Sequence, residues 1–431
     1  MMYVSTRGAA PPVTLGAAIA AGLAPDGGLY VAQTLPRLQP GTFADATTLP
    51  EVAQLLLAPF FTGDALAPDL ASICAEAFSI AAPLEPLATA RDHVLELFHG
   101  PTAAFKDFGA RFLAASMRRM HRDSAQPLTI LVATSGDTGA AVAAAFACVP
   151  GFRVVILYPD GRVSPRQAHQ LGCFGGNVAA LRVAGSFDDC QRLVKQAFAD
   201  GALRARVPLS SANSISLGRL LPQMSYYAHS SLAHVRARGT ALNYVIPTGN
   251  LGNAFAAVLA RAAGMPIGRI VLASNANRVL ADFFSGSDYA PRASIATLAN
   301  AMDVGAPSNF ERLRWLCPDD VSLRRDIRAF TVDDDAIRTT IQDRHARFGE
   351  IHCPHTATAV NVLQGLRRDG EEGDWAVVAT AHAAKFDSVV EPLIGCRVEV
   401  PTALAELLAR LSHAEPLPAD YAALRGRLLA H

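Results

Sequence analysis

Short apolar runs recur along the chain after residue 90, and segments with helical periodicity separate them. This alternation predicts buried parallel strands with helices on both faces of a sheet. The predicted strands are residues 94–100, 129–134, 153–159, 177–185, 242–248, 269–275 and 375–380. The predicted helices include residues 108–120, 188–201 and 253–264. We therefore expect an α/β fold built on open, mostly parallel sheets.

The first 90 residues differ from the rest, because they mix short apolar runs with many prolines and glycines. We expect them to form a separate N-terminal lobe, residues 1–90, that packs on the main body. The strand–helix region is expected to divide into a large lobe, residues 91–130 and 210–431, and a small mobile lobe, residues 131–209.

Composition and charge narrow the class of protein. Apolar residues make up 51% of the 431 residues and charged residues 18%, which is typical of a compact enzyme. The formal net charge is zero and no long basic run occurs, so neither nucleic acid nor an anionic membrane is an expected partner. The N-terminal residues lack the apolar core of a signal peptide, and no apolar run is long enough to cross a bilayer. The sequence does not decide between a monomer and a homodimer.

Seven cysteines are scattered singly without a CxxC pair, which indicates reduced thiols in the cytoplasm. They are Cys74, Cys148, Cys173, Cys190, Cys317, Cys353 and Cys396. The HCPH segment at 352–355 has the residue types of a metal site, but Pro354 and the lack of a second ligand pair favour a turn. We expect no metal.

Lys106 is the first candidate for chemistry, because it lies between Phe105 and Phe108 after a proline-containing turn. An ammonium among aromatic rings is poorly solvated, so its pKa should fall, and a neutral amine there can attack a carbonyl. A solvated surface lysine is the alternative for any single lysine.

Two predicted strands are followed by loops suited to anions. The loop SGDTG at 135–139 has two glycines, and Ser135 and Thr138 add hydroxyl donors at a helix N-terminus. The negative charge of Asp137 does not suit an anion site unless its carboxylate faces a group other than the anion. The loop PTGNLGN at 247–253 can wrap a phosphate with backbone amides, although it lacks the dinucleotide fingerprint. Each loop alone is also compatible with a simple turn.

Further polar residues follow other segments. Thr380 ends a predicted strand, and its hydroxyl suits either a heterocyclic nitrogen or a helix cap. Asn213, Ser214 and Arg219 lie within two helical turns, where the guanidinium can bind a second anion or simply face solvent. A reactive lysine with two anion sites suggests an aldehyde cofactor that carries a phosphate, for which pyridoxal phosphate is the obvious candidate.

Six motifs, in this order, resemble those of the threonine synthase family. They are HGPTAAFKDFG (99–109), ATSGDTG (133–139), SANSISLGR (211–219), PTGNLGN (247–253), LANAMDVGAPSNFERL (298–313) and ATAHAAKF (379–386). The resemblance extends from Tyr3 to about Phe386. It implies the type II fold of pyridoxal phosphate enzymes, shared with the tryptophan synthase β subunit, and a small-molecule substrate.

The resemblance also implies roles for individual residues. Lys106 would be the Schiff-base lysine, Thr380 would face the pyridine nitrogen and Asp137 would lie near the phenolic oxygen of the cofactor. The cofactor phosphate would be held by Gly249, Asn250, Leu251, Gly252 and Asn253. The substrate carboxylate would be bound by Ser135, Gly136 and Thr138, and the substrate phosphate by Asn213, Ser214 and Arg219.

The implied reaction converts O-phospho-L-homoserine and water to L-threonine and phosphate by γ-elimination and β-addition, with Lys106 as anchor and then base. Ser216 departs from the asparagine expected in many relatives, which bears on the phosphate subsite. Two alternatives stay open: a related phospho-lyase that releases a 2-oxo acid, and a catalytically silent regulatory relative. The intact Lys106, both glycine loops and Arg219 speak against the silent relative.

Overall fold

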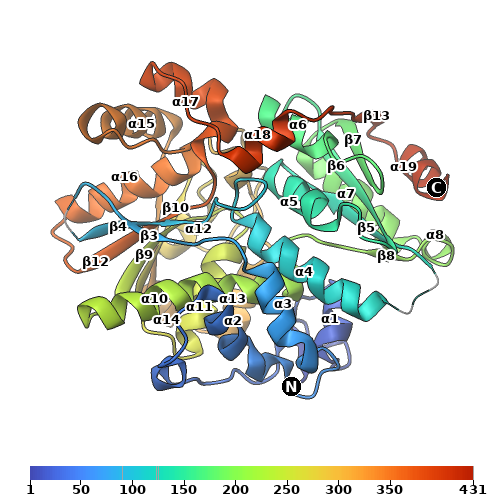
Figure 1. Cartoon of the computed structure of the whole chain (residues 1–431), viewed down its shortest axis with the longest axis horizontal. Coiled ribbons are helices and arrows are strands. Elements are labelled where there is room, and N and C mark those ends of the chain that lie inside the picture. The colour runs from blue at the N-terminus through green and yellow to red at the C-terminus, as the bar shows by residue number, and fades with distance from the viewer. Residues whose placement is uncertain (90, 123, 125, 431) are drawn as a thin grey trace.

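The computed structural model describes residues 1–89, 91–122, 124 and 126–430. It contains two open β-sheets side by side, each covered by helices, and an N-terminal region that packs below them (Figure 1). The expected α/β class with mostly parallel sheets is confirmed. No helix in the described part of the chain is long and apolar enough to cross a membrane.

The larger sheet has the strand order β11-β10-β9-β12-β4-β3. All its pairs are parallel except β3 with β4. Its strands are β3 (Leu84–Pro86), β4 (Asp92–Glu96), β9 (Leu242–Pro247), β10 (Ile267–Ser274), β11 (Ile327–Thr331) and β12 (Asp374–Ala379). Helices α10 (Met224–Arg238) and α11 (Gly252–Ala262) cover one face, and α16 (Pro354–Arg368) covers the other (Figure 1). Strands β9 and β12 are buried along their whole length, as continuous apolar runs predict.

The smaller sheet is parallel throughout, in the order β13-β7-β6-β5-β8. Its strands are β5 (Leu128–Ala133), β6 (Phe152–Pro159), β7 (Val178–Ala184), β8 (Leu209–Ser210) and β13 (Glu415–Pro418). Alternate residues of β5 point to opposite faces, so Ile130 packs in the core shared with α5 (Asp137–Phe146) and Leu131 packs in the core shared with α7 (Phe187–Ala199).

The remaining helices cover the sheets or connect them. They are α1 (Leu15–Ala21), α2 (Leu49–Leu57), α3 (Leu70–Ala77), α4 (Lys106–His121), α6 (Pro165–Gly172), α8 (Gly201–Arg204), α9 (Leu217–Leu220), α12 (Val279–Phe284), α13 (Phe310–Leu316), α14 (Asp320–Asp326), α15 (Asp334–Phe348), α17 (Asp387–Ile394), α18 (Thr402–Leu408) and α19 (Tyr421–Leu429). In the N-terminal region β1 (Tyr3–Ser5) pairs with β2 (Tyr30–Ala32), α2 packs on α10 and α3 packs on α4.

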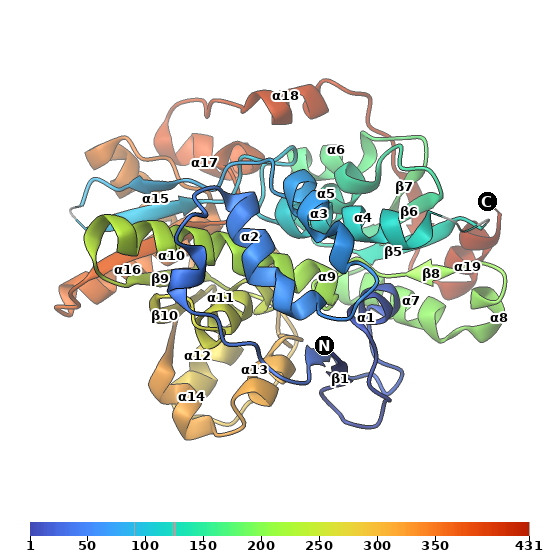
Figure 2. The ribbon, with the colours of Figure 1, turned by 60° about the horizontal axis from the view of Figure 1, so that its bottom comes forward.

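All seven predicted strands are present, with ends that shift by a few residues, but the edge strands β3, β8, β11 and β13 were not predicted. The segment of β13, Glu415–Pro418, contains two prolines and no apolar run, so only its pairing with β7 makes it a strand. The preceding chain, including α18, runs across the top of the molecule from α17 to the smaller sheet (Figure 2). Residues 415–418 thus lie in the smaller sheet, although the proposed lobe boundaries assign them to the large lobe.

Candidate active site

Lys106 is the first residue of α4 and follows a tight turn at the carboxyl ends of β4 and β12. The turn is bonded to the segment after β12, because the Phe105 N–H donates to the Thr380 carbonyl at 2.9 Å and the His382 N–H donates to the Ala103 carbonyl at 3.0 Å. Ala103 has a φ of 53° within this turn. The structure therefore brings Lys106 and Thr380 to the same edge of the large sheet, because β4 and β12 are parallel neighbours.

The amine of Lys106 is poorly solvated and lies 4.1 Å from the centre of the Phe105 ring. Burial, together with the positive charges of Arg219 and Lys385, lowers the pKa of this lysine to about 7, although Asp137 opposes the shift. The residue as a whole is partly exposed. The depressed pKa expected from the flanking aromatic rings is present, with neighbouring cations as a second cause.

The loop 135–139 is held by a residue that sequence reasoning did not single out. The Thr134 hydroxyl oxygen accepts the backbone N–H groups of Gly136, at 3.0 Å, and of Gly139, at 2.9 Å. These two amides are thus bonded within the loop rather than directed at a ligand. Gly136 has a φ of 127°, and a Cβ there would lie 2.7 Å from the Gln167 side chain. Ser135 and Thr138 remain partly exposed at the start of α5.

Asp137 faces a buried cation. Its Oδ1 atom lies 2.8 Å from Lys385 Nζ and accepts a 2.9 Å hydrogen bond from Gln167 Nε2. Burial by itself would raise the pKa of this carboxyl, but the charge of Lys385 overcomes that and holds the pKa below its usual value. The presence of a carboxylate in a loop expected to bind an anion is therefore explained, because Asp137 is paired with Lys385 inside the protein.

The loop 247–253 leads into α11 through Leu251, which has a left-handed φ of 63°. A Cβ on Gly249 would lie 2.7 Å from Met302 Cα, so only glycine allows this close approach of two backbones. The Asn253 Oδ1 atom accepts the hydroxyls of Tyr226, at 2.6 Å, and Tyr227, at 2.9 Å. Its buried Nδ2 group has no partner among the described residues. An unpartnered donor at the start of the 11-residue helix α11 suits a phosphate.

The group predicted to bind a second anion, Asn213, Ser214 and Arg219, lies beside the loop 247–253. Asn250 Nδ2 donates to Ser214 Oγ at 2.6 Å, and this bond joins the loop 247–253 to the segment 211–219. Arg219 is 1% exposed, donates to the Ala212 carbonyl at 2.6 Å and packs on Gly109 of α4. Burial lowers its pKa to about 10, and within the described chain no carboxylate forms an ion pair with it.

Unpartnered buried polar atoms gather in this group: Asn213 Oδ1, Ser216 Oγ and Arg219 Nε. A buried guanidinium nitrogen without an acceptor is costly unless a ligand supplies one. Together with Asn253 Nδ2, these atoms fit a ligand set that carries anionic oxygens. The residues present thus fit a phosphate-bearing cofactor together with an anionic substrate.

Two further residues beside the predicted site residues, Asn300 and His355, were given no role from the sequence. Asn300 donates to Gln167 Oε1 at 3.1 Å, and the Ala301 N–H donates to His355 Nε2 at 3.1 Å. His355 belongs to the HCPH segment, which begins α16 with Cys353 as its N-cap. Burial lowers the pKa of His355 to about 4, so it stays neutral and accepts this bond. Both residues lie in segments noted from the sequence: Asn300 belongs to the motif at 298–313, and His355 belongs to the HCPH segment.

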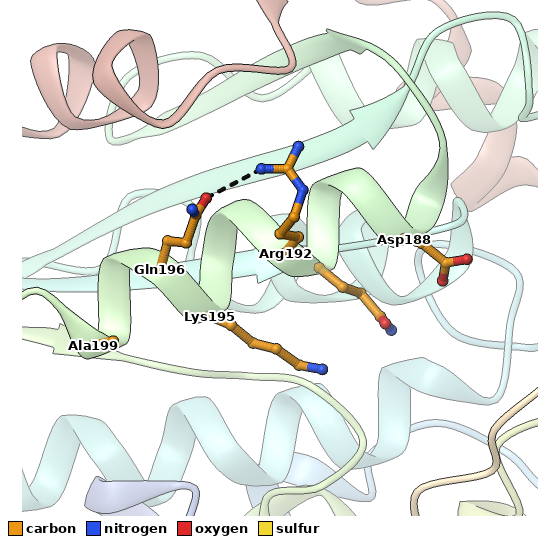
Figure 3. Close-up of a pocket in the computed structure, with 6 residues that line it drawn as sticks. Asp188, Arg192, Lys195, Gln196 and Ala199 are labelled. Carbon is orange, nitrogen blue, oxygen red and sulfur yellow. Dashed lines mark hydrogen bonds between the residues drawn. The ribbon is translucent and has the colours of Figure 1, made fainter. Parts of the chain in front are cut away.

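An open hollow on the surface of α7 lies apart from these residues. It is lined by Asp188, Gln191, Arg192, Lys195, Gln196 and Ala199, which project from one helix (Figure 3). None of the predicted site residues lines it. Its polar, solvent-facing side chains match a surface helix, so it is not the candidate active site.

Comparisons with known proteins find matching families, relatives and solved structures. The family described as pyridoxal-phosphate dependent enzyme matches residues 93–383, and the families described as threonine synthase N terminus and threonine synthase, C-terminal match residues 2–78 and 356–426. The threonine synthase of Escherichia coli (strain K12) is 39% identical, with 97% of each chain covered. The crystal structure of Escherichia coli threonine synthase matches with a TM-score of 0.92, at 36% identity over all of both chains. The structure of pyridoxal-phosphate-bound threonine synthase from Brucella melitensis matches with a TM-score of 0.90, at 34% identity over 100% of this chain and 99% of that one.

Proposed function

The chain belongs to the threonine synthase family of pyridoxal-phosphate-dependent enzymes, and on this basis we propose that it converts O-phospho-L-homoserine and water to L-threonine and phosphate. The observation that carries the proposal is the convergence of a partly desolvated Lys106 with two neighbouring groups of unpartnered anion-binding atoms. One group suits the phosphate of the cofactor, and the other suits the phosphate of the substrate.

Specific residues are proposed to hold the cofactor. Lys106 anchors its aldehyde carbon, the loop Gly249–Asn253 binds its phosphate, and Thr380 faces its ring nitrogen. Bound pyridoxal phosphate supplies an electron sink for the negative charge that remains when a proton leaves the substrate. Thr380 offers a neutral hydroxyl to the ring nitrogen, which restrains the sink compared with an acidic partner. Asp137 is proposed to lie near the phenolic oxygen, where its carboxylate is balanced by Lys385.

The remaining proposed residues act on the substrate. Ser135, Gly136 and Thr138 orient the carboxylate at the start of α5, and Asn213, Ser214 and Arg219 bind the phosphate. The amine of Lys106, when it is free, would take the proton from the α carbon of the substrate. With a pKa of about 7, this amine is neutral for much of the time at physiological pH, as a base must be. It later returns a proton to the α carbon, after water has added at the β carbon.

The setting proposed for this reaction is the cytoplasm, with the free thiols of all seven cysteines as support. The proposed partner is the small-molecule substrate. The lobe boundaries given above remain part of the proposal: the two sheets meet at the site, so a mobile small lobe would admit substrate and then exclude water.

The decisive experiment incubates the purified chain with pyridoxal phosphate and O-phospho-L-homoserine and measures phosphate, L-threonine and 2-oxobutyrate. Equal amounts of phosphate and L-threonine are the expected result. Phosphate with 2-oxobutyrate and no threonine would instead identify a phospho-lyase. No release of phosphate from the substrate by protein that has bound its cofactor would overturn both assignments.

A further inference from the structure

Lysine is rare in this chain, which has 35 arginines but only three lysines, Lys106, Lys195 and Lys385. Lys195 is exposed on α7, where its side chain extends away from the helix (Figure 3). The other two meet in the candidate active site. Because the chain uses arginine for almost every other cation, a lysine buried at position 385 indicates a need for a compact ammonium rather than a planar guanidinium.

The ammonium of Lys385 is fully buried and joins two segments of the site. Its side chain is 0% exposed, and Nζ lies 2.8 Å from Asp137 Oδ1 and 2.7 Å from the Thr102 carbonyl oxygen. Asp137 begins α5 beside the smaller sheet, whereas Thr102 belongs to the turn that carries Lys106. One side chain therefore connects the loop after β5 to the reactive lysine.

The backbone around Lys385 makes a second connection to the smaller sheet. The Lys385 carbonyl accepts the Ser164 hydroxyl at 2.8 Å, and the Ala384 carbonyl accepts Arg166 Nη1 at 2.6 Å. Ser164 and Arg166 lie at the start of α6. The segment Ala383–Phe386 is thus fixed on both sides, and the Lys385 ammonium has little freedom to move away from Asp137.

The titratable groups near Lys106 come from five segments. Arg219 on α9 and Lys385 both lower its pKa, whereas Asp137 on α5 raises it. His355 on α16 is neutral at physiological pH, because burial lowers its pKa to about 4. Asp107, which follows Lys106 on α4, is bonded to the Thr102 hydroxyl and N–H and faces Lys385 as a second carboxyl. The charge of Asp137 on Lys106 is therefore opposed by Arg219 and also by Lys385, which lies directly against Asp137.

We propose that Lys385 is a positioning residue of the active site, which neutralises Asp137 and thereby sets the charge around the Lys106 amine. This role is distinct from that of a structural tether, because it predicts opposite effects of removing the two partners. Loss of the Lys385 charge leaves Asp137 uncompensated and favours the protonated form of Lys106. Loss of the Asp137 charge leaves a cation beside Lys106 and favours the neutral form.

The test measures the titration of Lys106 directly. The full-length chain is stripped of cofactor and acetylated with trace acetic anhydride at a series of pH values, and the Lys106 and Lys195 peptides are quantified by mass spectrometry. Exposed Lys195 is an internal control that should titrate alike in every variant. The variants are Lys385→Met, Asp137→Asn and the double variant. Circular dichroism and thermal unfolding establish that each is folded.

The expected midpoint for Lys106 rises in Lys385→Met and falls in Asp137→Asn, each by roughly one pH unit, the size typical of a nearby charge. In the double variant it lies between those of the two single variants. Unchanged midpoints would overturn the proposal. A rise in both single variants would do the same, since general loosening of the site exposes the amine to water. If Lys385→Met does not fold, the comparison of Asp137→Asn with the double variant still decides, because the double variant must titrate at the higher pH.

The inference builds on the proposed role of Lys106, but the labelling experiment separates the two. It reads the charge around Lys106 in the absence of cofactor and substrate, so it succeeds or fails whichever product the enzyme forms.

Discussion

Asn250 donates a 2.6 Å hydrogen bond to the Ser214 hydroxyl, so the loop proposed for the cofactor phosphate contacts the segment proposed for the substrate phosphate. Asn250 is fixed on its other side as well, because its Oδ1 atom accepts the Ser308 N–H at 2.6 Å and its carbonyl accepts Asn309 Nδ2 at 3.1 Å. The two phosphate sites are therefore parts of one bonded unit, and a change in one should affect the other.

Ser214→Ala should weaken the binding of both ligands. Removal of the hydroxyl leaves the Asn250 amide without its acceptor, which costs about 1 kcal/mol, or about fivefold in affinity. We expect a Kd for pyridoxal phosphate and a KM for O-phospho-L-homoserine that rise together, measured by cofactor fluorescence titration and steady-state kinetics. Ser116→Ala is the matched control, since its buried hydroxyl on α4 has no partner in the described residues and is not part of the proposed site. A rise in KM alone would show that the loops act independently.

Lys106→Ala should retain cofactor binding through the loop Gly249–Asn253 but lose turnover. The amine that holds and moves the α proton is gone, whereas the phosphate donors are untouched. Equilibrium dialysis with pyridoxal phosphate and an assay for L-threonine check the two halves of this prediction. Lys195→Ala, on the exposed face of α7, should behave as the parent. Threonine formation near the parent rate in Lys106→Ala would refute the assignment.

Arg219→Met should weaken binding of the phosphorylated substrate with little change in core volume. A charge-assisted hydrogen bond contributes roughly 1.5–3 kcal/mol, so KM for O-phospho-L-homoserine should rise roughly 10- to 100-fold. Binding of L-homoserine, which lacks the phosphate, should change much less. Equal losses for the two ligands would indicate that Arg219 binds another part of the substrate or only supports the fold.

The depressed pKa of Lys106 should make the stability of the cofactor-free chain depend on pH. The unfolded chain binds a proton at this amine up to about pH 10.5, whereas the folded chain releases it above about pH 7. Between these values the unfolded state holds more protons, so the free energy of unfolding contributed by this group rises with pH. Urea unfolding of the parent and of Lys106→Met at pH 7, 8 and 9 should show a gain in the parent that the variant lacks. Parallel curves would mean that Lys106 is solvated.

Gly249→Ala should destabilise the chain and reduce cofactor affinity. The new Cβ would lie 2.7 Å from Met302 Cα, and neither backbone can move without displacing the loop. Gly41→Ala is a control, because a Cβ at Gly41 meets no atom within 4 Å. Thermal unfolding with and without pyridoxal phosphate should give a lower midpoint and a smaller cofactor-induced gain for Gly249→Ala only.

The sequence predicted the large-scale fold because apolar runs such as those of β9 and β12 are buried on both faces and bounded by glycine loops. Lys106 was singled out by its flanking aromatic rings, Thr380 by its place at the end of a predicted strand, and Asp137 through the family resemblance. Each follows a strand whose carboxyl end lies at the candidate site. The edge strand β13 was missed because its prolines give no strand pattern. Gln167 was missed, and Lys385 was given no role within the motif at 379–386, because their importance depends on long-range contacts with Asp137 and Thr102. Thr134 was read as the last residue of a strand, although its hydroxyl organises the loop that follows.

The pairing of β13 with β7 has a consequence for synthesis. Strand β7 ends at residue 184, but its outer neighbour is not made until residues 415–418 have been translated. For more than half of translation the nascent chain therefore carries an open sheet edge, and an unpaired edge is a template for association with other chains. Efficient production of the protein should depend on protecting that edge, through chaperones or low temperature, more than on the stability of the finished molecule.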